Sequence, residues 1–296
     1  MKAPWGDSRC ILCLQSAVLT EEHLIPSAIG GRLTSEFLCK PCNDQLGHKV
    51  ESAAKHDPNI AAAIYRFAAQ YPEQARSLAD RSRLLVTSPG GSAPAVRRGD
   101  EVRVISHKLA DGTLVQDSPE ARRTLRKLLV KAGMGAVPLA EALKQFDAAP
   151  ENEPLSFGPL SVTKWGVTGV KPDLSGPPLH DLVPIKTAYE FLAGHVGTAV
   201  YGDHPPLHAV REALRAGTPT EALVVERLTA NRTEPIHGIL FEGNYPHAQV
   251  QVRLFGTLAY RVHFKNIAVS GSRFAYTHRL DTNEEFLNEA AEVEAT

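Results

Sequence analysis

The alternation of hydrophobic and polar residues predicts helices in the middle of the chain and strands towards its end. Three segments, 236–241, 249–255 and 257–264, alternate apolar and polar residues at the period of a strand, and Gly256 marks a tight reversal. We expect these strands to form an antiparallel meander with one buried face. Apolar residues recur at helical spacing in 58–70, 118–133, 138–146, 185–196 and 206–216, and the acidic tail 281–296 is expected to form a surface helix.

The first 56 residues show a different order of elements. Short apolar stretches at 22–25 and 36–38 predict two strands, the Gly30–Gly31 pair between them predicts a reversal, and a helical pattern runs from Asn43 towards Glu51. This is a ββα unit. Because neighbouring side chains of a strand point to opposite faces, Glu22 and His23 cannot share one role. One can face a metal ion held together with Asn43, and the other can face a substrate.

The segments between these regions set the expected domain boundaries. A second helix is predicted at 74–85, the Pro- and Gly-rich stretch 88–94 is typical of a linker, and a hairpin is expected between 101–106 and 113–115, turned at Asp111–Gly112. The sequence therefore predicts an α+β protein: a small ββα unit in 1–56, connecting helices in 57–87, and a larger mixed domain in 88–296 for substrate recognition or regulation, ending in the meander.

Composition excludes several classes of protein. The chain has 296 residues, of which 43% are hydrophobic and 22% charged, as in ordinary globular proteins. The formal net charge of -1 gives the molecule no overall positive field, so any nucleic-acid surface must be a local patch. No window approaches a membrane span of about 20 apolar residues, and residues 1–10 lack the apolar core of a signal peptide. We expect a cytoplasmic protein without a membrane partner.

All four cysteines lie near the start of the chain, in two C-x-x-C pairs. Cys10 and Cys13 form the first pair, and Cys39 and Cys42 form the second. This spacing is typical of a structural zinc site with four thiolate ligands. Two disulfides, or four unrelated core thiols, are the alternatives, but a reducing compartment would not preserve disulfides. Because so short a segment buries little apolar surface, metal binding and folding are expected to be coupled.

The order of these features resembles the HNH endonuclease family in its zinc-stapled ββα-metal form. The resemblance covers residues 8 to 51 and comprises the first C-x-x-C, the sequence Glu22-His23-Leu-Ile-Pro, the Gly-Gly pair, and the second C-x-x-C followed by Asn43. It implies that His23 is the general base that activates water. It also implies that Glu22 and Asn43 bind a catalytic Mg²⁺ or Mn²⁺ ion, that zinc is structural, and that cleavage leaves a 3′ hydroxyl.

Two positions depart from the family pattern. Thr34 stands where the family usually has a second Asn, and Gly47 stands one helical turn after Asn43, where some relatives have a further metal-binding His. His48, the next residue, is a third candidate ligand of the catalytic ion. With only Glu22 and Asn43 as protein ligands, the ion would bind weakly or bind together with the nucleic acid.

The most basic part of the sequence lies beyond the ββα unit. Arginine and lysine side chains there could contact phosphates of a nucleic acid, or they could form an ordinary solvated helix face. The four histidines of the last third, His237, His247, His263 and His278, match no ligand spacing, and we interpret them as strand-edge residues. The candidate phosphate-contacting residues are Arg97, Arg98, Arg122, Arg123, Arg126 and Lys127.

The sequence leads to one main functional hypothesis and two alternatives. The main one is a metal-dependent HNH endonuclease that hydrolyses phosphodiester bonds, with double-stranded DNA as its expected substrate; by resemblance alone, restriction or defence against foreign DNA is a plausible role. A homodimer is one way to cut both strands, and sequential nicking is another. The first alternative is a zinc-stapled module that binds nucleic acid without cutting it, and the second is an RNA-cleaving toxin.

Overall fold

The computed structural model of the chain contains two compact units. Unit 1 comprises Met1–Leu78 and Leu174–Thr296, and unit 2 comprises Ala79–Asp173. The expected domain 88–296 is therefore divided between the two units, and its assignment to substrate recognition stays a prediction. The structure describes residues 1–3, 5–79, 83–89, 91–98, 101–108, 114–158, 160–175, 178–179, 181–218, 220, 223–229, 234–244, 247–265, 267 and 272–290.

The N-terminal part of unit 1 is a ββα unit, as the sequence predicts. Strands β1 (Leu19–His23) and β2 (Thr34–Cys39) are antiparallel and pair from Leu19 with Cys39 to His23 with Thr34. The connection between them holds a 3-10 turn, η1 (Ser27–Ile29), followed by the Gly-Gly pair. Gly30 has φ +89°, and a Cβ on Gly31 would lie 1.8 Å from the carbonyl oxygen of Ile25, so this reversal requires glycine.

A helical segment follows the second strand directly. It consists of α1 (Lys40–Leu46), a π-helical turn η2 (Gly47–Glu51) and the short α2 (Ser52–Ala54). Helix α3 (Pro58–Gln70) is capped by the Asp57 carboxylate, which accepts hydrogen bonds from the first turn, and it has the predicted bounds. Helix α4 (Pro72–Ala79) ends earlier than predicted, because residues 83–88 form a strand instead.

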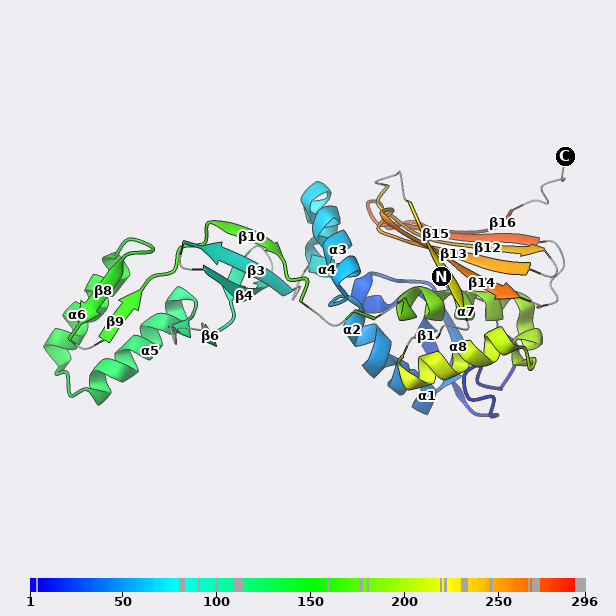
Figure 1. Cartoon of the computed structure of the whole chain (residues 1–296), viewed down its shortest axis with the longest axis horizontal. Helices are drawn as coiled ribbons and strands as arrows, with labels where there is room; N and C mark the ends of the chain where they lie inside the picture. Colours follow the sequence, from blue (N-terminus) through cyan, green and yellow to red (C-terminus); the bar gives the residue numbers. More distant parts are fainter. Residues whose placement is uncertain are drawn as a thin grey trace. The chain divides into compact units, whose positions relative to one another are not determined.

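Helix α7 (Leu182–Val196) lies at the centre of unit 1. Every residue from Leu182 to Ala193 is buried. Figure 1 shows the C-terminal sheet on one side of this helix and the ββα unit with α8 (Pro205–Ala216) on the other. Two of its side chains bond to the ββα unit: Tyr189 Oη donates to the Ile11 carbonyl oxygen (2.6 Å), and Thr187 Oγ1 donates to that of Leu24 (2.9 Å). The turn η3 (Gly197–Tyr201) follows the helix.

The C-terminal part of unit 1 is a six-stranded antiparallel sheet in the order β11-β14-β13-β12-β15-β16. The antiparallel pairing of β12, β13 and β14 confirms the predicted meander. The inner face of the sheet packs against α7, in one continuous core with the ββα unit. The predicted C-terminal helix is wrong: Glu285–Ala290 is an edge strand paired with β15, and residues 291–296 lie outside the described part. The strands are β11 (Val224–Leu228), β12 (Ile236–Asn244), β13 (His247–Leu254), β14 (Leu258–Lys265), β15 (Ser272–Arg279) and β16 (Glu285–Ala290).

Unit 2 corrects two predictions. The expected linker 88–94 is part of a hairpin, because β3 (Arg83–Ser88) pairs with β4 (Gly91–Arg98). Strand β5 (Glu101–Val104) pairs with β4, whereas the described part of the expected second strand, β7 (Leu114–Val115), pairs with β6 (His107–Lys108). The predicted turn at 111–112 lies outside the described residues. Strand β10 (Gly169–Pro172) completes the sheet in the order β10-β3-β4-β5.

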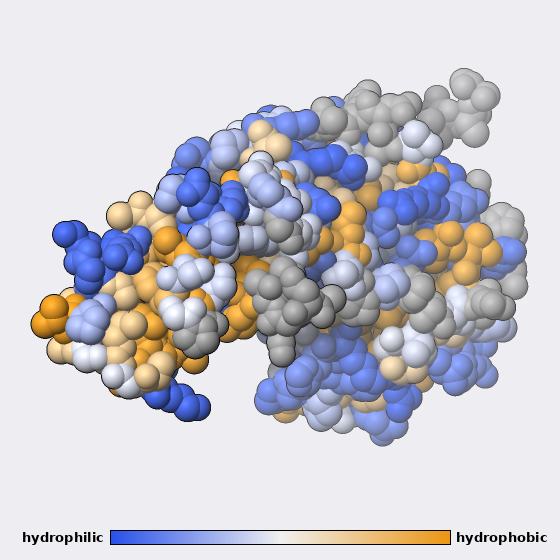
Figure 2. Space-filling model, turned by 60° about the vertical axis from the view of Figure 1, so that its left-hand side comes forward, coloured by the Kyte–Doolittle hydropathy of each residue, from blue (hydrophilic) through white to orange (hydrophobic). Residues whose placement is uncertain are grey.

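The rest of unit 2 is a helical pair with a small core. Helices α5 (Ser118–Lys131) and α6 (Ala136–Ala148) pack together and against the hairpin of β8 (Pro154–Phe157) and β9 (Leu160–Thr163) around Leu125, Leu129 and Phe146. Figure 2, which brings unit 2 forward, shows hydrophobic residues exposed among hydrophilic ones. Val137 on α6 is 81% exposed. Among the described residues, no helix combines the length and apolar character needed to cross a bilayer.

The buried His237 joins the sheet to the ββα unit. It lies on β12, an interior strand, so its interpretation as a strand-edge residue is wrong, as it is for the buried His278. The ring Nε2 lies 2.9 Å from the Ile29 carbonyl oxygen, and the Phe255 amide lies 3.4 Å from Nδ1. A neutral ring that donates from Nε2 and accepts at Nδ1 satisfies both contacts. Burial lowers the pKa of His237 from 6.5 to about 3.

This histidine predicts a pH dependence of stability. The unfolded chain binds a proton at His237 below pH 6.5 and the folded protein does not, so its contribution is complete above pH 6.5 and is lost as the pH falls towards 3. Between these two pH values, His237 changes the free energy of unfolding by about 1.4 kcal/mol per pH unit. Urea unfolding at several pH values between 4.5 and 7 measures this dependence. The free energy of unfolding should change less steeply with pH in His237→Gln than in the wild type. Equal slopes would contradict a buried neutral ring.

Candidate functional site

The four cysteines converge on one point in unit 1. Cys10 and Cys13 lie in the loop before β1, Cys39 ends β2, and Cys42 lies in the first turn of α1. Their sulfur atoms all lie within 4.8 Å of one another, and none forms a disulfide. The Cys13 and Cys39 sulfurs are 3.7 Å apart, close to the edge of about 3.8 Å of a tetrahedron with zinc–sulfur bonds of about 2.3 Å. The cluster can hold a structural metal such as zinc.

Burial affects the chemistry of this cluster. It raises the pKa of the Cys10 and Cys42 thiols, and neighbouring sulfurs raise that of Cys42 further. Without a metal, these groups therefore keep their protons. A bound zinc ion would displace the protons and replace four separate thiols by four bonds to one centre, which ties the first loop, β2 and α1 together.

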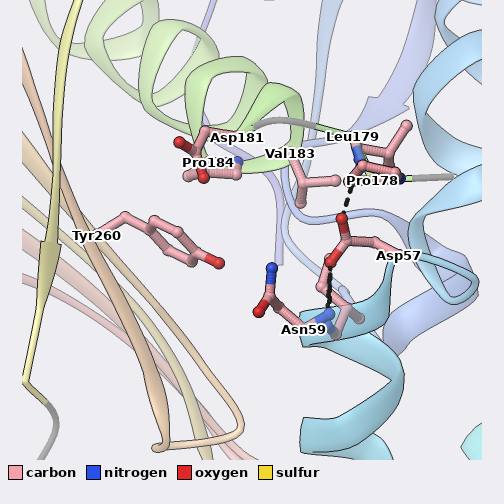
Figure 3. Close-up of a pocket in the computed structure, with 9 residues that line it drawn as sticks. Asp57, Asn59, Pro178, Leu179, Asp181, Val183, Pro184 and Tyr260 are labelled. Carbon is pink, nitrogen blue, oxygen red and sulfur yellow. Dashed lines mark hydrogen bonds between the residues drawn. The ribbon is translucent and has the colours of Figure 1, made fainter. Parts of the chain in front are cut away.

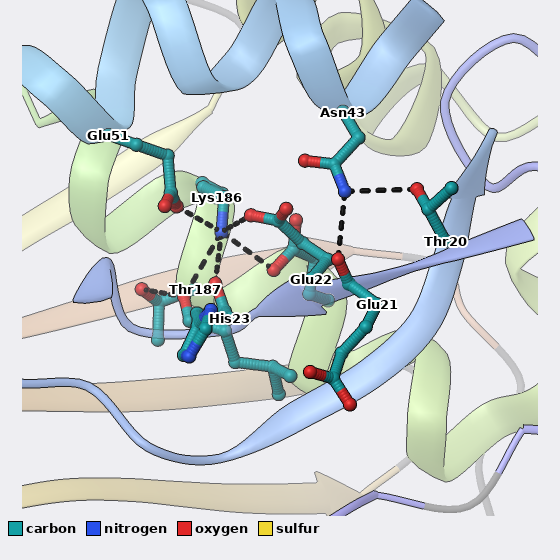
Figure 4. Close-up of polar contacts among 10 residues, drawn as sticks. Thr20, Glu21, Glu22, His23, Asn43, Glu51, Lys186 and Thr187 are labelled. Atoms are coloured by element: carbon teal, nitrogen blue, oxygen red, sulfur yellow. Dashed lines mark hydrogen bonds and ion pairs between the residues drawn. The ribbon is translucent and has the colours of Figure 1, made fainter. Parts of the chain in front are cut away.

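Asn43 connects helix α1 to strand β1. Its Nδ2 donates to Thr20 Oγ1 (3.0 Å) and to the carbonyl oxygen of Glu21 (2.9 Å), so both amide hydrogens are used on the strand. The amide orientation is thereby fixed, and Oδ1 is left without a hydrogen-bond donor among the described residues. Figure 4 shows Oδ1 turned to the side on which the Glu22 carboxylate lies. The structure thus brings these two predicted ligands to the same side of β1.

Glu22 and His23 point in opposite directions from the end of β1, as the strand period requires (Figure 4). Glu22 points inward and is 4% exposed. The His23 ring is partly exposed, and its nitrogens make no hydrogen bond or ion pair with a described residue. The ring is therefore available to a substrate or to water, whereas the carboxylate is enclosed.

The enclosed carboxylate belongs to a buried charge cluster that the sequence did not predict. Lys186 of α7 is fully buried, and its Nζ lies 2.7 Å from Glu22, 2.9 Å from Glu51 and 3.0 Å from Glu190. Nζ also donates to the carbonyl oxygen of His23. An ammonium group has three protons, so it cannot satisfy all of these oxygens at once. One carboxylate oxygen of each of the three glutamates lacks a well-aligned hydrogen bond.

The charges of this cluster do not balance when all of its groups are ionised. Burial raises the pKa of Glu22 to about 7, against the opposing effect of Lys186, and Glu51 raises it further. Burial also raises the pKa of Glu190. Burial would lower the pKa of Lys186, but the three carboxylates hold it well above its usual value. Near neutral pH, the cluster therefore contains a charged lysine, and burial favours protonated carboxyl groups around it.

Two sequence signals could have revealed this cluster. Lys186 and Glu190 are four residues apart in an otherwise apolar helix, so they share one face, and a buried ion pair is the usual way to place two charges there. Glu51 follows Asn43 by eight residues along the same helical segment. Only the three-dimensional fold shows that these residues meet Glu22, because α7 is more than 160 positions away in the sequence.

The remaining predicted site residues lie elsewhere. His48 is exposed in η2 and makes no side-chain hydrogen bond with a described residue, so its role as a ligand stays a prediction. In unit 2, Arg97 and Arg98 end β4, whereas Arg122, Arg123, Arg126 and Lys127 lie on α5. The Arg122 guanidinium is paired with Asp147 (2.9 Å), so it is partly neutralised.

A small cavity of about 170 Å³ lies apart from these residues in unit 1. It is bordered by the starts of α3 and α7 and by Tyr260 of β14 (Figure 3). Asp57 uses its carboxylate to cap α3 and to accept a hydrogen bond from the Leu179 amide (2.9 Å). The Asp57 carboxylate therefore joins the start of α3 to the segment before α7, and none of the predicted catalytic residues lines the cavity.

The cysteine cluster leads to a direct prediction of zinc binding. Replacing Cys42 with serine removes one thiolate, so we expect the zinc content to fall from about one ion per chain and the urea midpoint of unfolding to decrease. Metal analysis and urea unfolding measure the two effects. Treating the wild type with a strong chelator should lower its midpoint in the same way. A Cys42→Ser protein with full zinc content and unchanged stability would contradict a four-thiolate site.

The burial of Lys186 leads to a prediction about stability. Lys186→Met leaves three enclosed carboxylates without their cation, and we expect the free energy of unfolding to fall by about 3–5 kcal/mol. Adding Glu190→Gln should recover part of this loss, because one uncompensated carboxylate is removed. Lys40→Met is the control, since Lys40 forms an exposed pair with Asp44 and should change stability by less than about 1 kcal/mol. If Lys186→Met lowers the free energy of unfolding no more than Lys40→Met does, Lys186 does not compensate the buried carboxylates.

Comparison with known proteins places the ββα unit in a family. The model of the HNH endonuclease family matches residues 10–59, a segment that contains both cysteine pairs, Glu22, His23 and Asn43. No curated protein and no solved structure gives a significant match to the chain. The match agrees with the metal-binding arrangement of the cysteines and confirms the resemblance that the motifs indicated. The N-terminal segment of this protein is an HNH endonuclease domain, with four cysteines placed to bind a metal as in the zinc-stapled form.

Proposed function

We propose that the protein is a metal-dependent endonuclease whose active site is formed by His23, Glu22 and Asn43. The observation that carries the proposal is the position of Asn43. Its amide is bonded to β1 through both hydrogens, and its free Oδ1 is turned to the side of Glu22, while the His23 ring projects from the other face of the same strand end. One rigid ββα unit thus presents two oxygen ligands and one imidazole.

The donor set fits a hard divalent ion. Carboxylate and amide oxygens are ligands that Mg²⁺ and Mn²⁺ accept. Among the described residues, Glu22 belongs to no group of three or more His, Cys, Asp or Glu side chains that could hold a metal. Such an ion would keep several waters and bind substrate phosphate, which accounts for a site with two protein ligands. When bound, it would stabilise negative charge on the scissile phosphate and the leaving oxygen.

The chain's own residues supply the rest of the reaction. His23 takes a proton from the attacking water, because an imidazole can accept a proton near neutral pH and its ring is accessible. Lys186 holds the carbonyl oxygen of His23 and the Glu22 carboxylate, so it positions both residues from beneath the strand. Because burial raises the pKa of Glu22 to about 7, binding of a divalent ion there would displace the proton from those molecules that carry it.

The HNH domain implies a nucleic-acid substrate, and we propose double-stranded DNA. Arg126 and Lys127 on α5 are exposed and have no ion pair with a described residue, so they are candidates for phosphate contacts in unit 2. A homodimer would allow both strands to be cut. Restriction or defence is consistent with such an activity, and a cytoplasmic location would keep the four zinc-binding thiols reduced.

One observation favours a second candidate function. Glu22 is almost fully enclosed and ion-paired with Lys186, so its carboxylate is less available to a metal than that of an open site. A zinc-stapled module that binds nucleic acid without cutting it would need no catalytic ion at Glu22. The two functions differ in whether His23 is required for any activity.

The test is cleavage of supercoiled plasmid DNA by the wild type and by His23→Ala in Mg²⁺, Mn²⁺ and EDTA. We expect metal-dependent nicking or cutting that falls about 10²–10⁴-fold in the variant, because a general base is lost. The control is His208→Ala, an exposed histidine paired with Glu212 on α8, which should cleave like the wild type. Zinc content should be unchanged in both variants.

Other outcomes would redirect the proposal. Binding without cleavage by a zinc-loaded wild type, on modified and unmodified plasmid, would favour the binding module. Cleavage of RNA but not of duplex DNA would favour an RNA-cleaving toxin. Cleavage that persists in His23→Ala would show that another group activates the water.

A further inference from the structure

The outer face of the C-terminal sheet contains a hollow that the nuclease site does not use. Its volume is about 490 Å³, within the range of small-molecule sites. The hollow lies over the middle strands, on the face opposite the one that packs against α7. Alternation along β13 shows the two faces: Val250 and Val252 are buried, and Gln251 and Arg253 face outward. The residues of this hollow are Ile236, Gly238, Ile239, Leu240, Gln251, Arg253, Arg273, Ala275, Tyr276, Thr277 and Asn288.

The floor of the hollow is small and apolar. Gly238 pairs with Arg253 on one side and with Thr277 on the other, and Leu240 pairs with Ala275. Because Gly238 and Ala275 have little or no side chain, the longer side chains around them form walls, and the sheet surface between them is free for a flat ligand. A Cβ added to Gly238 would be 3.8 Å from its nearest neighbours, so the space above it is unfilled.

The walls carry one cation that is not neutralised. Arg273 lies 3.4 Å from Glu242, and Gln249 and Gln251 also donate to that carboxylate. Arg253, by contrast, makes no hydrogen bond or ion pair with any described residue, although it is only partly exposed. A guanidinium with five free donors is suited to a phosphate or carboxylate group of a ligand.

The other walls suit a ring with polar edges. Gln251 and Asn288 line the hollow, and their amide groups can both donate and accept hydrogen bonds. Phe286 is 45% exposed on β16 and pairs with Thr277, which lines the hollow, so an aromatic side chain that is open to solvent stands at its border. An exposed aromatic ring beside amide groups and a guanidinium matches the chemistry that recognises a nucleobase and its phosphate.

We propose that this hollow binds a free nucleoside monophosphate. The base would lie over Gly238 and Ala275, with its edge towards the amides of Gln251 and Asn288, and the phosphate would bind Arg253. A nucleic-acid strand would need a basic path across the sheet, whereas the neighbouring cations on this face are paired, Arg261 with Glu226 (3.2 Å) and Arg273 with Glu242. Arg253 is the one cation lining the hollow without an ion pair to a described residue, and it suits one phosphate group.

The inference does not depend on the nuclease proposal. The hollow and the HNH domain lie on opposite sides of α7, so a nucleotide bound here is not the one that is cut. Binding can therefore be measured in EDTA, in a protein that carries His23→Ala, and failure of cleavage would leave the result intact.

The test is calorimetric titration of the full chain with the four 5′-nucleoside monophosphates, with inorganic phosphate, and with a ten-nucleotide single strand. We expect at least one monophosphate to bind more tightly than phosphate alone, since base and phosphate both contribute. Arg253→Gln should weaken it at least tenfold, because a charge-assisted hydrogen bond is lost. Gly238→Val keeps all charges and fills the floor, and should abolish binding.

Arg261→Gln is the matched control, since it removes an arginine from the same face outside the hollow and should leave binding within twofold of the wild type. Thermal melting checks that each variant is folded; if Gly238→Val is not, Arg253→Gln decides the outcome. No binding by any monophosphate, or binding that neither variant weakens, would overturn the proposal. Tighter binding of the single strand that Arg253→Gln also weakens would replace the free nucleotide by a strand.

Discussion

The burial of Lys186 is the constraint on which the arrangement of unit 1 depends. A lysine this far from water is stable only if oxygens surround it, and Glu22, Glu51 and Glu190 provide them together with the peptide oxygen of His23. These groups come from β1, the turn after α1, and α7. Since separating any one of them would leave charge uncompensated, the HNH domain and the central helix are held in one relative position.

This arrangement explains why the HNH domain is not a separate body. Its hydrophobic core is continuous with that of α7 and the C-terminal sheet, and the hydrogen bonds of Tyr189, Thr187 and His237 attach its loops to those elements. The cysteine cluster fixes the domain internally, whereas the lysine cluster fixes it to the rest of unit 1. The end of β1, with its Glu22-His23 pair, lies between the cysteine cluster and the lysine cluster.

The C-terminal sheet has two faces with different physical roles. Its inner face is apolar and completes the core around α7, so its residues serve stability. Its outer face does not contribute to the hydrophobic core, and its polar groups are mostly paired with one another across the strands. Departures from that pattern, such as a small apolar floor beside an unpaired Arg253, are therefore informative about binding.

The sequence by itself determined the cysteine cluster, the ββα order, the family and the antiparallel meander, because each follows from local spacing or periodicity. It also separated Glu22 from His23, since strand geometry forces neighbours apart. The tertiary structure alone decided that Lys186 meets Glu22, and that residues 88–94 and 285–290 are strands, because these depend on partners distant in the sequence or on sheet pairing. Local pattern specified the type of the elements with strong periodicity, whereas pairing with remote segments decided the type of 88–94 and 285–290, and burial decided what the side chains do.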